Sequence, residues 1–267
     1  MRTLSLGVSR NHAGATVEAW PEILCQGLAA GLGSAVKPAL YEDYDHLLGA
    51  VLDGSADVAW LPPLLHARAA AQGVRLLALP QRGGWLTFRS ALLVRKDSPA
   101  RSLQDLRGAR MAWRDRASAS GYLFPRLELA RRGGLPLAAE KFYGSLVEAA
   151  QAVLSGEADA CTCYVTDAAA HDADRAAAEI EKALGPMARE LRAVHVTDPI
   201  PPDGFVVGVR VGEQERAAIG AALLGLHTTV EGKKALEQVL HAERLAPVTD
   251  ALLRSLQSWA EAATARA

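Results

Sequence analysis

The sequence predicts an α/β protein in which helices cover parallel β-sheets. Short apolar runs that are typical of strands alternate with helix-like segments from one end of the chain to the other. Half of the 267 residues are hydrophobic, which is enough to bury a large core in one or two domains. No linker rich in Pro, Gly or Ser and no internal repeat divides the chain.

Eight apolar runs are the expected strands. In chain order they are Leu4–Ser9, Val36–Leu40, Asp57–Leu61, Leu76–Leu79, Ala91–Arg95, Arg110–Trp113, Asp159–Val165 and Phe205–Val211. Apolar residues recur at helical spacing from Leu146 to Leu154 and from Ile219 to Val230. Both of these segments are therefore expected to form amphipathic helices.

The charge and cysteine content exclude several classes of protein. The net charge of −1, with 22% charged residues, provides no basic surface for nucleic acid. No apolar run approaches the roughly 20 residues that cross a bilayer. The three cysteines, Cys25, Cys161 and Cys163, are an odd number and do not indicate a disulfide framework. Buried free thiols are expected instead.

The first residues, Met1 to Thr3, lead directly into the first strand. This arrangement leaves no room for the charged, apolar and cleavage regions of a secretory signal. Two alternatives stay open: a mature domain from which a signal was trimmed, which would be periplasmic, or a protein that works in the cytoplasm.

A segment rich in serine, residues 114–125, joins an expected strand directly to a helix. The start of a helix has N–H groups without partners and a positive partial charge. Ser118 and Ser120 add hydroxyl donors, and Gly121 has no side chain to keep an oxyanion away. The segment therefore predicts an anion-binding turn, although a serine that only caps the helix is the alternative.

Several motifs occur in a particular order along the chain: Lys96–Ser98, Leu103–Gly108, Ser118–Tyr122, Asp198–Asp203 and Glu231–Leu236. In this order the chain closely resembles the phosphonate-binding (PhnD-like) proteins of ABC importers, within the type 2 periplasmic binding proteins. The resemblance extends over nearly the whole sequence.

The resemblance implies a two-lobed α/β fold with a ligand cleft between the lobes. The chain would cross twice between them, near residues 96–101 and 194–202. Residues 98–196 would form one lobe, and residues 1–97 together with 197–267 the other. Such crossings let two lobes close over a ligand.

The site residues implied by the resemblance include Tyr44, which matches a tyrosine that the family places on its ligand. Trp60 either walls the cleft or belongs to the core. Three positions depart from the family pattern, because Ala119 replaces a threonine, Phe88 a tyrosine and Leu146 a histidine. The loss of three polar groups makes tight binding of a dianionic phosphonate unfavourable and favours a monoanion, a smaller oxyanion or a more apolar ligand.

Other polar residues could contribute to the site. Arg10 and His12, after the first strand, could restore polarity, although a solvent-facing loop is the favoured interpretation of His12. Arg114 and Arg116 flank the serines. Asp167 lies loosely where the family binds the amine of an aminophosphonate.

We expect a binding protein that closes on a small phosphonate- or phosphate-like anion for an ABC importer. No motif indicates a catalytic site, a metal or a cofactor. The expected partners are the anion and an ABC permease, with no nucleic acid, and the protein is expected to be a monomer. Two alternatives stay open: a cytoplasmic enzyme on the same fold, resembling those of the menaquinone pathway, and a ligand sensor.

Overall fold

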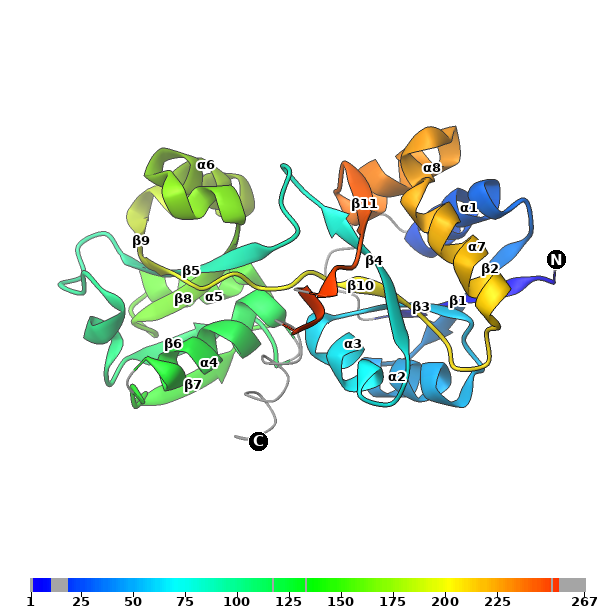
Figure 1. Ribbon diagram of the computed structural model, residues 1–267. Helices are drawn as coiled ribbons and strands as arrows, with labels where there is room; N and C mark the ends of the chain where they lie inside the picture. The colour runs from blue at the N-terminus through cyan, green and yellow to red at the C-terminus, as the bar shows by residue number, and fades with distance from the viewer. Residues whose placement is uncertain (1, 11–18, 117, 133, 251, 255–267) are drawn as a thin grey trace. The chain divides into compact units, whose positions relative to one another are not determined.

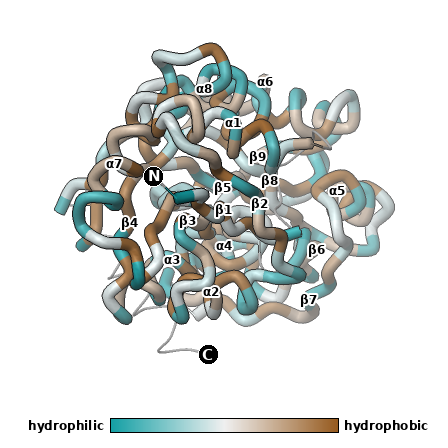
Figure 2. The backbone as a smooth tube through the Cα atoms, turned by 90° about the vertical axis from the view of Figure 1, so that its right-hand side faces the viewer, coloured by the Kyte–Doolittle hydropathy of each residue, from teal (hydrophilic) through white to brown (hydrophobic). Residues whose placement is uncertain are grey.

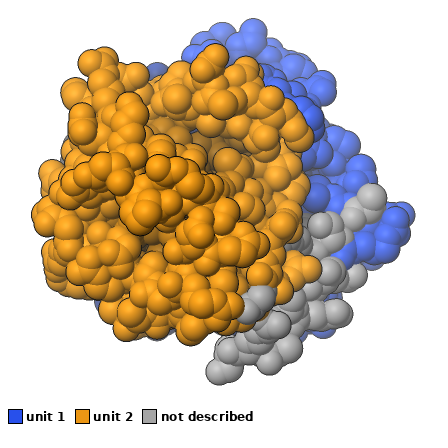
Figure 3. All heavy atoms as spheres, turned by 90° about the vertical axis from the view of Figure 1, so that its left-hand side faces the viewer, with its two compact units in different colours: residues 1–86, 201–267 blue, residues 87–200 orange. Residues whose placement is uncertain are grey.

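The computed structural model describes residues 2–10, 19–116, 118–132, 134–250 and 252–254. The chain divides into two compact units. Unit 1 contains residues 1–86 and 201–267, and unit 2 contains residues 87–200 (Figure 3). Each unit has its own β-sheet, with the elements labelled in Figure 1.

The sheet of unit 1 has the strand order β11-β4-β10-β3-β1-β2. Its strands are β1 (Leu4–Ser9), β2 (Val36–Tyr41), β3 (Val58–Leu61), β4 (Arg75–Gln81), β10 (Gly204–Val207) and β11 (Arg244–Pro247). Alternate side chains of β3 point to opposite faces, so that Val58 and Trp60 join one core and Ala59 and Leu61 the other.

Helices cover both faces of this sheet. One core contains α1 (Trp20–Leu32), α7 (Glu213–Leu224) and α8 (Val230–Ala235), whereas the other contains α2 (Tyr44–Asp53) and α3 (Pro63–Ala70). Single helical turns occupy Leu226–Thr228 and Leu236–Leu240.

The sheet of unit 2 has the order β7-β6-β8-β5-β9. Its strands are β5 (Phe88–Arg95), β6 (Arg110–Trp113), β7 (Ala139–Phe142), β8 (Ala160–Thr166) and β9 (Leu191–Val196). The core on one face contains α5 (Leu146–Leu154) and α6 (Ala173–Leu184), and the core on the other contains α4 (Phe124–Arg131). Shorter turns lie at Leu103–Leu106, Ala119–Leu123, Asp167–His171 and Gly185–Glu190.

The covering helices are amphipathic. In α6 the buried residues Ala176, Ile180 and Leu184 recur at every fourth position, while three charged residues and three alanines lie between them. Figure 2 shows this mixture of hydrophobic and hydrophilic residues along the helices. Among the helices of the described ranges, none combines the length and the apolar character needed to span a bilayer.

The prediction that the sheets are parallel was wrong for several strand pairs. β1 pairs in parallel with β2 and β3, and β6 with β7 and β8. However, β5 is antiparallel to β8 and β9, and β10 is antiparallel to β3 and β4. Both antiparallel strands, β5 and β10, are the first strands after the chain passes from one unit into the other, so no crossover helix within the sheet sets their direction.

The units divide at residues 86/87 and 200/201, whereas the sequence predicted boundaries at 97/98 and 196/197. The difference at the first boundary is β5, which pairs only within the sheet of unit 2. Residues 96–101, expected to be a crossing, form a turn in unit 2 whose carbonyl groups at Lys96, Ser98 and Ala100 accept hydrogen bonds from Arg192.

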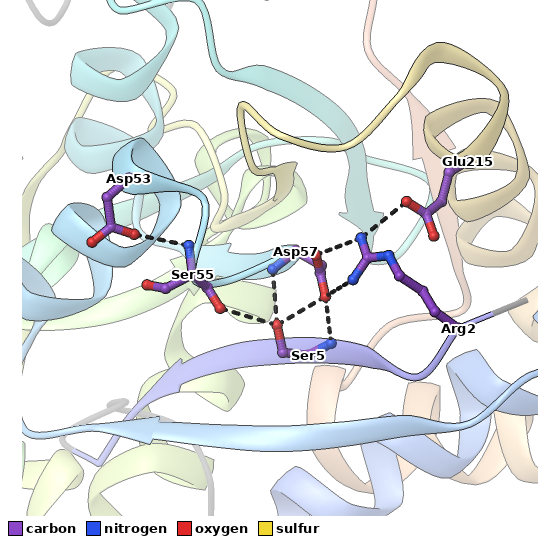
Figure 4. A network of polar contacts seen from close by, with 6 residues as sticks. All are labelled: Arg2, Ser5, Asp53, Ser55, Asp57 and Glu215. Carbon is purple, nitrogen blue, oxygen red and sulfur yellow. Dashed lines mark hydrogen bonds and ion pairs between the residues drawn. The ribbon is translucent and has the colours of Figure 1, made fainter.

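A polar network secures the amino-terminal edge of the sheet of unit 1 (Figure 4). The carboxylate of Asp57, just before β3, accepts hydrogen bonds from the Arg2 guanidinium at 2.7 and 2.9 Å and from the Ser5 N–H at 2.8 Å. Arg2 also contacts Glu215 of α7 at 3.0 Å. The network therefore joins β1, β3 and α7.

All three cysteines are free and buried. Cys25 lies in α1, and Cys161 and Cys163 lie in β8. Burial raises the pKa of Cys25 and of Cys163 to about 12 and also raises that of Cys161. The thiols therefore behave as small apolar core groups, as the sequence indicated.

Candidate functional site

One edge of the sheet of unit 2 carries most of the predicted site residues. The parallel strands β6, β7 and β8 all end at this edge, and antiparallel β5 begins there because Phe88 pairs with Thr166. Ser118–Gly121 follow β6, Leu146 follows β7 and Asp167 follows β8. Ligands of open α/β sheets bind at this type of edge.

The serine-rich turn begins a helix that is continuous from Ala119 to Arg131. Ser118 is its N-cap, because the Ser118 Oγ accepts the N–H of Gly121 at 3.0 Å. The first turn is a π-turn: Ser118 O accepts the N–H groups of Tyr122 at 3.1 Å and of Leu123 at 3.0 Å. Such turns are frequent at functional sites.

Two N–H groups of this turn remain available. Within the described residues, neither the Ala119 N–H nor the Ser120 N–H forms a hydrogen bond. Both belong to peptide groups whose carbonyl oxygens, on Ser118 and Ala119, are bonded within the helix. Because the N–H and C=O of a trans peptide point in opposite directions, these N–H groups have a fixed direction at the helix start.

Hydroxyl groups of the sheet hold the next two carbonyl groups. The Ser90 Oγ of β5 donates to Ser120 O at 2.8 Å, and the Thr162 Oγ1 of β8 donates to Gly121 O at 3.2 Å. Ser90 itself is fixed by Thr197, whose Oγ1 accepts the Ser90 N–H at 3.0 Å. Ser90, Thr162 and Thr197 are all buried.

Aromatic packing anchors the same helix. The ring of Tyr122 lies edge-on to Trp113 and Phe142, with centroid distances of 5.4 and 4.9 Å. The guanidinium group of Arg116 lies over the ring of Phe142, 4.4 Å from its centroid. Arg114 lies 3.5 Å from the carboxylate of Asp115. The Arg114 Nε is nevertheless buried without a hydrogen bond, and the ring contact of Arg116 leaves its positive charge in place.

Asp167 is engaged within unit 2. Its carboxylate accepts hydrogen bonds from the Thr87 hydroxyl and the Arg89 guanidinium, and Arg89 also donates to Thr197 O at 2.8 Å. The side chains of Arg89 and Asp167 are 16% and 6% exposed. The negative charge of Asp167 is therefore balanced locally, which reduces its attraction for a ligand amine.

Two of the three departures from the family pattern, Phe88 and Leu146, are packed as core groups. Phe88 is buried, with its ring centroid 5.2 Å from that of Tyr164 in β8. Leu146 begins α5 after the N-cap Ser145 and packs at the margin of the core beneath α5 and α6. Neither side chain offers a hydrogen bond to an anion.

The remaining predicted residues lie in unit 1. Tyr44 begins α2 just after β2 and is half-buried, and Arg10 follows β1 and is exposed. Trp60 is only 2% exposed, with its ring stacked on Phe205 at 6.0 Å and edge-on to Trp20 at 5.9 Å. This burial favours the core alternative for Trp60. His12 lies outside the described residues.

A buried histidine of unit 1 was not singled out from the sequence. His66 of α3 is 1% exposed, and its Nε2 lies 3.2 Å from the carbonyl oxygen of Pro202. Because a carbonyl can only accept, the Nε2 carries the proton. Burial lowers the pKa of His66 to about 4, so the imidazole is neutral in the folded protein at neutral pH.

Sequence reasoning also missed Ser90 and Thr162. A signal was present, because each is a lone hydroxyl residue inside an otherwise apolar run, Ser90-Ala91-Leu92-Leu93 and Ala160-Cys161-Thr162-Cys163. A buried hydroxyl needs a hydrogen-bond partner, but the sequence does not identify that partner. Nor do the described residues bring three or more His, Cys, Asp or Glu side chains together in a way that could hold a metal ion.

Comparison with solved structures confirms the predicted fold class. XAC2383 from Xanthomonas citri, bound to ATP, matches with a TM-score of 0.81 and 21% identity, covering 98% of this chain and 97% of that one. PhnD1 from Prochlorococcus marinus, in complex with methylphosphonate, matches with a TM-score of 0.70 and 18% identity, covering 97% of each chain. The chain therefore has the α/β fold of periplasmic binding proteins.

The sequence is similar to a curated relative and to a family profile. A phosphate-import protein, PhnD of Mycolicibacterium smegmatis, is 24% identical over 178 residues, which are 61% of this chain and only 56% of that protein's length. The profile of the family described as the phosphonate periplasmic substrate-binding protein of ABC transporters matches residues 8–253. Since that match covers nearly the whole sequence, the protein belongs to the family of phosphonate-type substrate-binding proteins of ABC transporters.

Proposed function

We propose that this protein is a solute receptor that binds a small oxyanion at Ser118–Gly121 and presents it to an ABC permease. Membership of the family supports a binding protein and not an enzyme. Methylphosphonate and ATP, bound to two of the structural relatives, both present phosphorus oxyanions, and the curated relative is named for phosphate import.

The observation that carries the proposal is the pair of N–H groups on Ala119 and Ser120. They lie at the start of a helix, where the partial positive charge favours an anion. The Ser118 Oγ accepts the Gly121 N–H as the cap and keeps its own O–H to donate, and Ser120 adds a second hydroxyl donor. Ser120 is half-buried, which leaves this turn accessible.

The surrounding charges define the class of anion. The guanidinium of Arg89 is paired with Asp167, whereas Arg114 lies 3.5 Å from Asp115 and Arg116 lies over Phe142, a contact that leaves its positive charge in place. Phe88 and Leu146 add no donors. We propose a monoanion as the bound form, because these apolar side chains do not compensate for the hydration that a second negative charge would lose.

A calorimetric titration with methylphosphonate, 2-aminoethylphosphonate, phosphite, phosphate and sulfate tests this proposal. The phosphorus oxyanions should bind more tightly at about pH 5.5 than at about pH 8.5, because they lose their second proton between these values. Sulfate, which keeps the same charge, controls for changes in the protein. The aminophosphonate should gain nothing from its amine.

Two results would count against the proposal. Binding of none of the five anions would remove the oxyanion function. Tight binding of 2-aminoethylphosphonate, with phosphate much weaker, would show that a carboxylate such as Asp167 is available to the ligand after all.

A further inference from the structure

We propose that Ser90 and Thr162 are positioning residues of the oxyanion site. They would not touch the ligand. Instead, they would fix the orientation of the peptide groups that surround the N–H groups of Ala119 and Ser120. The inference rests on the proposed function, because it assigns residues to the same site.

Two side-chain hydroxyls attach the start of the helix to the sheet. Ser90 holds Ser120 O at 2.8 Å, and Thr162 holds Gly121 O at 3.2 Å. The two hydroxyls come from neighbouring strands, β5 and β8, in which Ser90 pairs with Tyr164 and Leu92 with Thr162. Two anchors on a rigid sheet leave this turn little freedom to rotate about the helix axis.

The hydrogen bonds of the π-turn differ from those of an α-helix. In an α-helix the carbonyl of residue i bonds the N–H of residue i+4. Here Ser120 O and Gly121 O bond sheet hydroxyls, Gly121 O also accepts the Arg114 N–H at 3.3 Å, and Ala119 O bonds the N–H of Phe124, five residues later. The hydroxyls thereby stabilise the widened turn at whose start the Ala119 and Ser120 N–H groups lie.

Both hydroxyl residues are buried. Ser90 is 0% and Thr162 is 1% exposed, so neither hydroxyl has an alternative partner in water. Ser90 is also fixed from the other side, because Thr197 accepts its N–H at 3.0 Å and donates its own N–H to Ser90 O at 2.9 Å. Loss of either hydroxyl would leave a buried or half-buried carbonyl with a weaker set of partners and let the turn move.

The test compares two variants at Thr162. Thr162→Val keeps the shape of the side chain and removes the hydroxyl, whereas Thr162→Ser removes a methyl group and keeps the hydroxyl. We expect the valine variant to bind phosphate about tenfold more weakly and the serine variant to stay within about threefold of the wild type. A role in packing alone would give the reverse order, because only the serine variant leaves a cavity.

Thr166→Val is the matched control. It removes a hydroxyl from the same strand, but that hydroxyl contacts Glu179 at 2.6 Å and not the serine turn. Ser90→Ala should weaken phosphate binding in the same way as Thr162→Val. Equal affinities for Thr162→Val, Thr166→Val and the wild type would overturn the assignment.

A second measurement needs no ligand. In amide NMR spectra of the free protein, the Ala119 and Ser120 N–H resonances should shift in Ser90→Ala and in Thr162→Val and stay in place in Thr166→Val. Unchanged resonances in both site variants would refute the positioning role. If the wild-type protein binds none of the tested anions while these shifts occur, the proposed function fails and the positioning of the turn stands.

Discussion

Substitution of Gly121 by alanine tests the geometry of the serine turn directly. A Cβ at this position would lie 2.5 Å from Ser118 Oγ and 2.7 Å from Arg114 Cβ, which is too close for either atom. Overpacking of this kind costs about 1–3 kcal/mol, and loss of the Ser118 cap adds about 1 kcal/mol. We therefore expect Gly121→Ala to lower the free energy of unfolding by about 2–4 kcal/mol and to weaken phosphate binding.

Gly49 provides the matched control for this substitution. It lies inside α2, is exposed, and a Cβ there would meet nothing within 4 Å. Alanine is the better helix former, so Gly49→Ala should raise the free energy of unfolding by about 1 kcal/mol. Urea unfolding followed by circular dichroism measures both variants, and calorimetry measures phosphate affinity. If Gly121→Ala matched the wild type in both assays, the close packing around Ser118 would be wrong.

Two further predictions concern buried charge. The pKa of His66 is about 4 in the folded protein, against an ordinary value of 6.5. As the pH falls below 6.5, the unfolded chain therefore takes up a proton before the folded protein does. The free energy of unfolding is highest above pH 6.5 and decreases as the pH falls toward 4. Urea unfolding should show that the wild type loses about 3 kcal/mol more than His66→Gln between about pH 7 and about pH 4, and parallel pH profiles would contradict this. Asp167→Asn leaves Arg89 without its counter-charge and should lower the free energy of unfolding by about 3 kcal/mol, with no change in 2-aminoethylphosphonate affinity. The exposed pair of Asp97 with Arg95 is the control, because Asp97→Asn should have no measurable effect on the free energy of unfolding. A loss of aminophosphonate affinity in Asp167→Asn would show that the Asp167 carboxylate does contact the ligand.

The sequence was sufficient to predict the buried strands and insufficient to predict the polar strands. Runs such as Leu4–Ser9 and Arg110–Trp113 are buried and follow the predicted bounds closely. The strand β7, with the sequence Ala-Glu-Lys-Phe, lies at an edge of its sheet and is mostly exposed, so no apolar pattern marks it. The early start of β5 was missed because Arg89 reads as a surface residue, and its partner Asp167 lies 78 residues away.

The same distinction applies to the site: its local interactions could be predicted from the sequence, and its long-range interactions could not. The helix start at Ser118 was predictable because capping is a local interaction between residues three positions apart. The hydroxyls that hold this turn come from β5 and β8, 30 and 41 residues away in sequence, and only the sheet brings them together. Trp60 could not be assigned from the sequence either, since its burial depends on Trp20 and Phe205.

The buried thiols make this protein suitable for selective chemical labelling. With a pKa of about 12, roughly one in 100,000 molecules carries the thiolate of Cys25 or Cys163 at neutral pH, and burial also blocks access of a reagent. A cysteine introduced at Val230, which is 80% exposed, would react with a maleimide dye in the presence of the three native thiols. A fluorescent receptor could thus be prepared without first removing any native cysteine.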